Sequence, residues 1–161
     1  MIIMHKLKHK DFIKDPFIHE EYTNKSVGKT VAFCDYDSEQ KNFNIYYLHN
    51  VNTWVKLHEL GHANLGHIGC RRTLWDDCKD ELDASLWANS KLVKRISVYN
   101  IVRCVSQMIQ GKGCVTKTFN LTIKHLKYKG ITLTDSEISL FWNTLIKYHK
   151  TKNITQSINK N

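Results

Sequence analysis

The chain has 161 residues and a mass of 18.9 kDa, which is enough for one domain with a substantial core and too little for two domains of ordinary size. Hydrophobic residues make up 42% of the chain, yet no apolar run reaches the roughly 18 residues that a membrane-spanning helix needs. Five cysteines, an odd number without a C-x-x-C pair, argue against a disulfide framework and a cysteine zinc knuckle. The first residues also lack the apolar stretch of a signal peptide, so we expect a cytoplasmic protein with reduced thiols and no membrane association.

The formal net charge of +9 is unevenly distributed along the chain. Residues 111–161 carry nine Lys and Arg against two Asp and Glu, whereas residues 1–110 carry 15 against 13. Such a basic segment can attract nucleic acid or an acidic partner protein. A solvated helical face followed by a basic tail explains the same bias, so the composition leaves both interpretations open.

The first predicted elements are two short strands. Residues 31–34 (VAFC) and 43–48 (FNIYYL) are runs of β-branched and aromatic residues, and the polar segment DYDSEQKN separates them. Runs of this kind on either side of a short polar segment are typical of paired strands. The sequence therefore predicts a small antiparallel hairpin or meander.

A helix is predicted from Thr53 to about Leu65, because apolar residues recur there at intervals of three and four. Asn52 or Thr53 can cap its start, since their short side chains accept hydrogen bonds from the free amides of a first turn. Gly66 suits its end, where a residue with positive φ is common.

Three further helices are predicted, over residues 76–90, over residues 91–110 and from residue 134 onward. The last begins with the capping box Thr134-x-x-Glu137 and carries an apolar face. From Thr151 the segment TKNITQSINKN offers little to bury, so fraying or disorder is expected there. Three tryptophans (Trp54, Trp75 and Trp142) are expected in the core, and Glu20–Glu21 is expected to be a solvated pair.

The predicted helix at residues 53–65 contains the sequence H-E-L-G-H, from His58 to His62. On a helix the two histidines lie about 40° apart around the axis and about 6 Å apart along it, so both imidazoles can reach one metal ion. Two neutral nitrogens suit zinc. Glu59 lies on the flank of the same face, where a general base acting on water is required. Gly61 lets a second element approach the helix closely beside these residues.

A catalytic zinc needs a third protein ligand and an open fourth position, and several residues are candidates for the ligand. His67 can join only if the chain turns sharply at Gly66. Asp76, Asp77 and Asp80 have the character of charges at a helix N-terminus. Glu81 is the preferred choice, because it begins a helical face of small residues (Ala84, Ser85 and Ala88) that can pack against the metal-binding helix.

These residues carry a family resemblance. HELGHANLGH, followed by ELDASLWA, resembles the ImmA/IrrE family of zinc metallopeptidases, in which H-E-L-G-H and a nearby L-G-H precede an E-x-E-A-N/D-x-F-A segment. The match covers about residues 43–92 and places Glu81 at the metal-binding glutamate of the family. Ser85 stands where the family usually has Asn or Asp.

The resemblance implies an α+β fold, zincin-like, with a short antiparallel sheet packed on the H-E-x-x-H helix and a mostly helical C-terminal part. From the length of the chain and the absence of a linker we expect one metallopeptidase domain over residues 1–150, before a basic and disordered tail at residues 151–161. The implied ligands of Zn²⁺ are His58, His62 and Glu81, with Glu59 as the catalytic base. The implied substrate is a protein, such as the DNA-binding repressor of a phage or mobile element.

Two other functions remain open from the sequence. The protein can hold zinc and act as an antirepressor or interaction module without turnover, although the intact Glu59 argues against this. It can also bind nucleic acid directly, although its aromatic residues are not interleaved with the C-terminal lysines in a recognised motif. The sequence also does not identify the side chain that would stabilise an oxyanion. Three residues are chemically able to do so: His67, Tyr99 and Tyr128.

Overall fold

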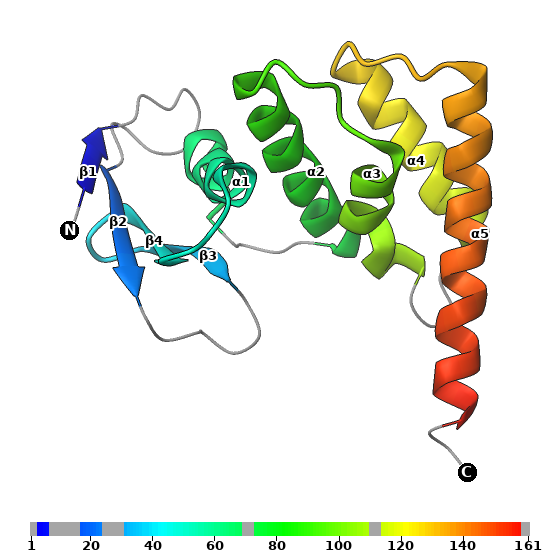
Figure 1. The fold of residues 1–161 in the computed structure, drawn as a ribbon, viewed down its shortest axis with the longest axis horizontal. Coiled ribbons are helices and arrows are strands. Elements are labelled where there is room, and N and C mark those ends of the chain that lie inside the picture. The colour runs from blue at the N-terminus through cyan, green and yellow to red at the C-terminus, as the bar shows by residue number, and fades with distance from the viewer. Residues whose placement is uncertain (1–2, 7–16, 24–30, 69–72, 110–113, 159–161) are drawn as a thin grey trace. The chain divides into compact units, whose positions relative to one another are not determined.

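The computed structural model describes residues 3–6, 17–23, 31–68, 73–109 and 114–158. The chain has an α+β fold, as predicted, in which a sheet is followed by helices (Figure 1). None of the described helices is both long enough and apolar enough to cross a membrane. The elements, in chain order, are β1 (Ile3–Lys6), β2 (Phe17–Thr23), β3 (Ala32–Asp37), β4 (Asn42–Leu48), α1 (Thr53–Leu65), α2 (Leu74–Lys91), α3 (Val98–Val105), the 3₁₀ helix η1 (Ser106–Ile109), α4 (Val115–Tyr128) and α5 (Asp135–Ile158).

Contacts within the chain divide it into two compact units. The first, unit 1, comprises Met1–Arg71 and Asp83–Arg95, and the second, unit 2, comprises Arg72–Leu82 and Ile96–Asn161. Helix α2 is continuous and contributes residues to both units. The single domain expected over residues 1–150 stays a prediction.

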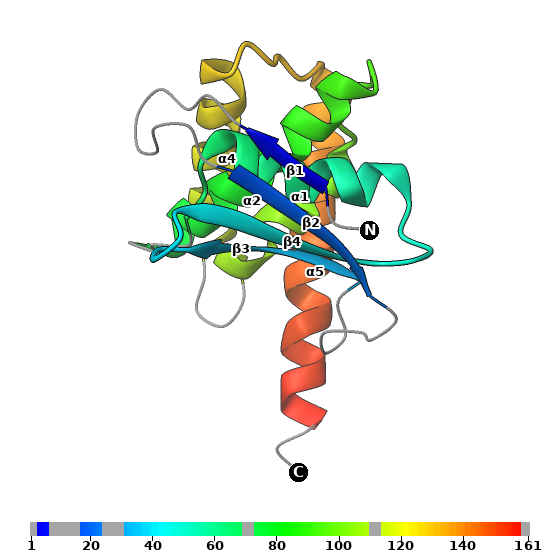
Figure 2. The same cartoon turned by 90° about the vertical axis from the view of Figure 1, so that its left-hand side faces the viewer.

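The sheet of unit 1 has the strand order β1-β2-β4-β3 (Figure 2). Strands β3 and β4 pair antiparallel and confirm the predicted hairpin. Strand β2 pairs parallel with β4, however, so the sheet is mixed, and the prediction of an antiparallel sheet is wrong in this respect. Two reversals of the chain separate β2 from β4, and strands related by two reversals run in the same direction.

One face of this sheet packs against α1 and forms the core of unit 1. Its fully buried members are residues from β2, β4 and α1: Ile18, Phe43, Ile45, Tyr47 and Ala63. Because alternate residues of a strand share a face, β2 places Ile18 and Glu20 toward the same core. Apolar burial of this kind stabilises the unit by about 25 cal/mol for each Å² removed from water.

Glu20 corrects the prediction of a solvated Glu20–Glu21 pair. Its side chain is only 5% exposed, and its carboxylate accepts a hydrogen bond of 2.9 Å from the Tyr47 hydroxyl. Burial, together with the adjacent Glu20 charge, raises the pKa of Tyr47. A buried carboxylate needs such a donor, and Tyr47 lies 27 residues further along the chain.

Capping residues set the first residue of two helices in unit 2, α3 and α5. Ser97 accepts a hydrogen bond from the amide of Asn100, and α3 therefore starts at Val98 rather than at residue 91 as predicted. The predicted capping box of α5 is confirmed by bonds in both directions between Thr134 and Glu137. These bonds satisfy amides of the first turn that have no partner within a helix.

Two parts of unit 2 differ from expectation. Helix α4 was not predicted. Helix α5 continues through Ile158, whereas disorder was predicted from Thr151, and residues 159–161 of that tail lie outside the described residues. The segment from Thr151 to Ile158 contains neither Gly nor Pro, so nothing in it stops a helix that is already formed.

Candidate metal centre

Helix α1 places the two histidines of H-E-x-x-H one turn apart. Its bounds, Thr53–Leu65, are those predicted, because both ends are fixed locally. The Asn52 side chain accepts a hydrogen bond of 2.9 Å from the Val55 amide, and Gly66 ends the helix with a φ of 72°. Neither cap depends on the rest of the fold.

The histidine rings of this helix converge on one point. The Nε2 atoms of His58 and His62 lie 3.2 Å apart, and the two rings are nearly perpendicular, at 87°. Two nitrogens, each 2.0–2.1 Å from a tetrahedral zinc, lie about 3.3 Å from one another. The observed separation fits such an ion.

Helix α2 packs against α1 with almost no space between their backbones. Gly61 is buried, and a Cβ atom added there would lie 2.9 Å from the carbonyl oxygen of Ala84. Ala84, Ser85 and Ala88 of α2 are also buried. The predicted close approach at Gly61 and the predicted small-residue face of α2 are thus confirmed.

Glu81 lies one helical turn before Ser85 on α2. One ligand atom from each of His58, His62 and Glu81 lies within 4.8 Å of the other two, and all three residues are half-buried. In the described part of the chain, this is the one group of three such residues that could hold a metal ion. The structure therefore brings together the three residues predicted as ligands.

The aspartates considered for the third position do not belong to this group. Asp76 accepts a hydrogen bond of 2.8 Å from the Thr73 hydroxyl, and its carboxylate lies 2.7 Å from the Lys79 ammonium. Its position in the first turn of α2 confirms the expected helix-terminal role. Asp77 and Asp80 follow it on the same helix and are likewise outside the group.

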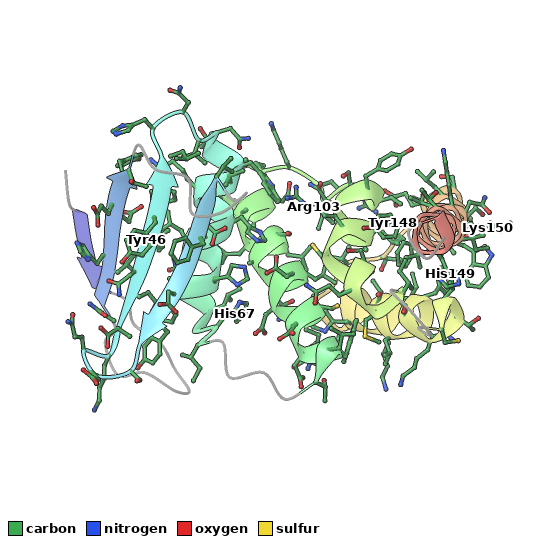
Figure 3. All side chains as sticks on the ribbon, turned by 90° about the horizontal axis from the view of Figure 1, so that it is seen from below. Tyr46, His67, Arg103, Tyr148, His149 and Lys150 are labelled. Atoms are coloured by element: carbon green, nitrogen blue, oxygen red, sulfur yellow. The ribbon has the colours of Figure 1, made fainter. Side chains whose placement is uncertain are left out.

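Each candidate histidine ligand is also contacted through its other ring nitrogen. The buried hydroxyl of Ser85 lies 3.2 Å from Nδ1 of His58. Nδ1 of His67 lies 2.9 Å from Nδ1 of His62, and Figure 3 shows His67 beside the end of α1. Partners of this kind fix the orientation and tautomer of ligating histidines. Ser85 thus contacts the site although it replaces the expected Asn or Asp.

Two residues near the site have positions that differ from expectation. Trp54 was predicted to be a core residue, but it is only half-buried and its ring stacks on that of His58, with centroids 5.2 Å apart. The sequence contained a signal for this contact, because Trp54 and His58 are four residues apart on one helix and therefore share a face. Among the candidate oxyanion donors, Tyr99 and Tyr128 are 65% and 84% exposed, whereas His67 contacts a candidate ligand.

Glu59 lies next to His58 but does not belong to the group of three. Burial raises the pKa of the Cys34 thiol in β3, and the charge of Glu59 adds to this effect. Cys34 therefore stays protonated and is a poor nucleophile. In the described sheet β3 pairs with β4 alone and is an edge strand.

Comparison of the chain with models of known protein families, with curated proteins and with solved structures finds no match. The geometry of His58, His62 and Glu81 is compatible with a metal site of the H-E-x-x-H type.

Proposed function

We propose that this protein is a zinc-dependent endopeptidase that hydrolyses a peptide bond in a regulatory protein, such as a phage or mobile-element repressor. The observation that carries the proposal is the convergence of Glu81 on the two histidines of an H-E-x-x-H helix. The resemblance of these segments to ImmA/IrrE metallopeptidases supports the same function and a zincin-like arrangement.

The donor set favours zinc as the metal. Two imidazole nitrogens and one carboxylate form a common catalytic zinc site, and they leave the fourth tetrahedral position open. When bound, zinc acts as a Lewis acid that polarises a carbonyl group and lowers the pKa of water. His58, His62 and Glu81 would hold the ion, while Ser85 and His67 orient the two imidazoles.

Glu59 is the proposed general base. It adjoins the candidate ligand His58 and is not one of the three residues of the ligand group, and its proposed role is to take a proton from the attacking water. The same carboxyl group can then deliver that proton to the leaving amine. A module that only binds zinc has no need of this carboxylate, which argues against the alternative of a silent antirepressor.

The sheet edge beside α1 favours a peptide as the substrate. In the described sheet β3 is an edge strand, and helix α1, which carries Glu59, packs against it. An extended peptide can add to such an edge through backbone hydrogen bonds, which provide affinity with little dependence on sequence. This geometry would present a peptide bond of a protein substrate to Glu59.

Replacing Glu59 with glutamine tests the proposal. Glu59→Gln keeps the size of the side chain but cannot accept a proton, so the variant is expected to bind stoichiometric zinc and to lose hydrolysis by several orders of magnitude. Metal analysis and a cleavage assay on a repressor encoded beside this protein measure both properties. Glu21→Gln, at an exposed position of β2, is the matched control and should cleave normally.

Unchanged biological activity in a zinc-loaded Glu59→Gln protein would refute hydrolysis and favour the antirepressor alternative.

A further inference from the structure

The turn that ends α1 folds His67 back onto His62. Gly66 adopts left-handed backbone angles, with φ 72° and ψ 36°. The His67 amide donates a hydrogen bond of 2.9 Å to the His62 carbonyl oxygen, and the Gly66 amide donates to Ala63 at 3.2 Å. This pair of bonds is that of a Schellman motif. The backbone therefore ties His67 to the same residue that its ring contacts.

The contact between the two rings requires a definite arrangement of protons. The Nδ1 atoms of His62 and His67 lie 2.9 Å apart, and a hydrogen bond between them needs one proton. If His67 donated it, a neutral His62 would carry its own proton on Nε2. That nitrogen is the one facing His58, and a protonated nitrogen cannot bind a metal. If His62 is to bind a metal through Nε2, its Nδ1 must therefore donate while His67 accepts.

We propose that His67 is a positioning residue of the metal centre, rather than a third ligand or an oxyanion donor. By accepting the Nδ1 proton of His62, it holds the tautomer in which the Nε2 lone pair of His62 is directed toward the metal. The inference rests on the proposed zinc site but does not depend on peptide hydrolysis. Ser85 contacts His58 at the corresponding nitrogen, so both candidate histidine ligands are oriented from outside.

The test is the zinc affinity of His67 variants, measured by competition with a chromophoric chelator. Removing a partner of a ligating histidine typically weakens metal binding by about 10–100-fold, and His67→Ala is expected to do so. His67→Asn is expected to restore most of the affinity, because its amide oxygen can accept a hydrogen bond near the position of Nδ1. His19→Ala removes an imidazole that contacts Asn44 in the sheet, and it should bind zinc as the wild type does.

A second measurement separates positioning from ligation. With Co²⁺ in place of zinc, the visible absorption reports the ligand set, so a positioning role predicts the wild-type spectrum in Co²⁺-saturated His67→Ala. Wild-type zinc affinity in His67→Ala would overturn the proposal, as would a changed Co²⁺ spectrum or a His67→Asn protein that binds as weakly as His67→Ala. Failure of the peptidase proposal would instead appear in the cleavage assay, with these affinities unaltered.

Discussion

Gly61→Ala tests whether the contact between α1 and α2 sets the geometry of the metal centre. The added Cβ would meet the backbone of Ala84, at 2.9 Å from its carbonyl oxygen and 3.1 Å from its Cα. Backbone atoms of a helix cannot rotate away as a side chain can. The substitution therefore requires α2 to move relative to α1 near Ser85.

The size of this displacement follows from the distances. Ordinary van der Waals contact begins at 3.4 Å, so the two backbones must separate by about 0.5 Å, whereas metal–ligand distances tolerate only about 0.2 Å. Overpacking costs about 1–3 kcal/mol, while alanine in place of glycine in a helix returns about 1 kcal/mol. The apoprotein should lose at most about 2 kcal/mol, but zinc affinity should fall at least about tenfold.

Two measurements check this expectation: thermal unfolding of the apoprotein, and zinc affinity by chelator competition. Gly130→Ala is the matched control, because Gly130 has a φ of 77° and nothing within 4 Å of an added Cβ. Its cost is backbone strain of about 1–2 kcal/mol without steric contact. The control should therefore lose stability but bind zinc normally. Wild-type zinc affinity in Gly61→Ala would refute the reasoning, because it would show that the site tolerates movement of α2.

Three further predictions concern the third ligand, the C-terminus and the basic surface. Glu81→Ala should lose zinc affinity before it loses its fold, and activity should be partly restored by excess zinc; normal zinc content would assign the third ligand to another residue. Removing residues 151–161 should leave zinc content unchanged and alter the melting temperature by only a few degrees, and a much larger decrease would show that the end of α5 is structural. Duplex DNA should show no gel shift at physiological salt; a shift that survives there and is lost when the exposed lysines of α4 (Lys117, Lys124 and Lys127) become glutamine would favour nucleic-acid binding.

Helix α4 shows why a regular element can escape prediction. Its buried positions, four residues apart, are Thr118, Thr122 and Leu126, so two of three core positions are polar and the apolar periodicity is weak. The hydroxyls of Thr118 and Thr122 donate to carbonyl groups one turn earlier, at 3.1 and 2.8 Å. Such bonds make burial of threonine possible, but they exist only once the helix has formed.

Strand β2 was missed for a related reason. Its inward residues include Glu20, whose charge breaks the alternation of apolar and polar residues that marks a half-buried strand. The donor that makes its burial possible is Tyr47, on a strand that pairs with β2 in parallel. Neither the identity of this hydrogen-bond donor nor the direction of strand pairing can be predicted from the residues of β2 alone.

The candidate site depends partly on neighbouring residues in the sequence and partly on tertiary packing. The sequence by itself determined α1, because Asn52 and Gly66 act within one turn of the helix ends, and it thereby determined that His58 and His62 share a face. Only the tertiary structure shows that Glu81, and not one of the aspartates, lies within reach of the two histidines, since this approach depends on the packing of α2 against Gly61. The role of His67 was undecided for the same reason: a residue beyond the end of a helix has no predictable direction until the backbone angles of Gly66 are known.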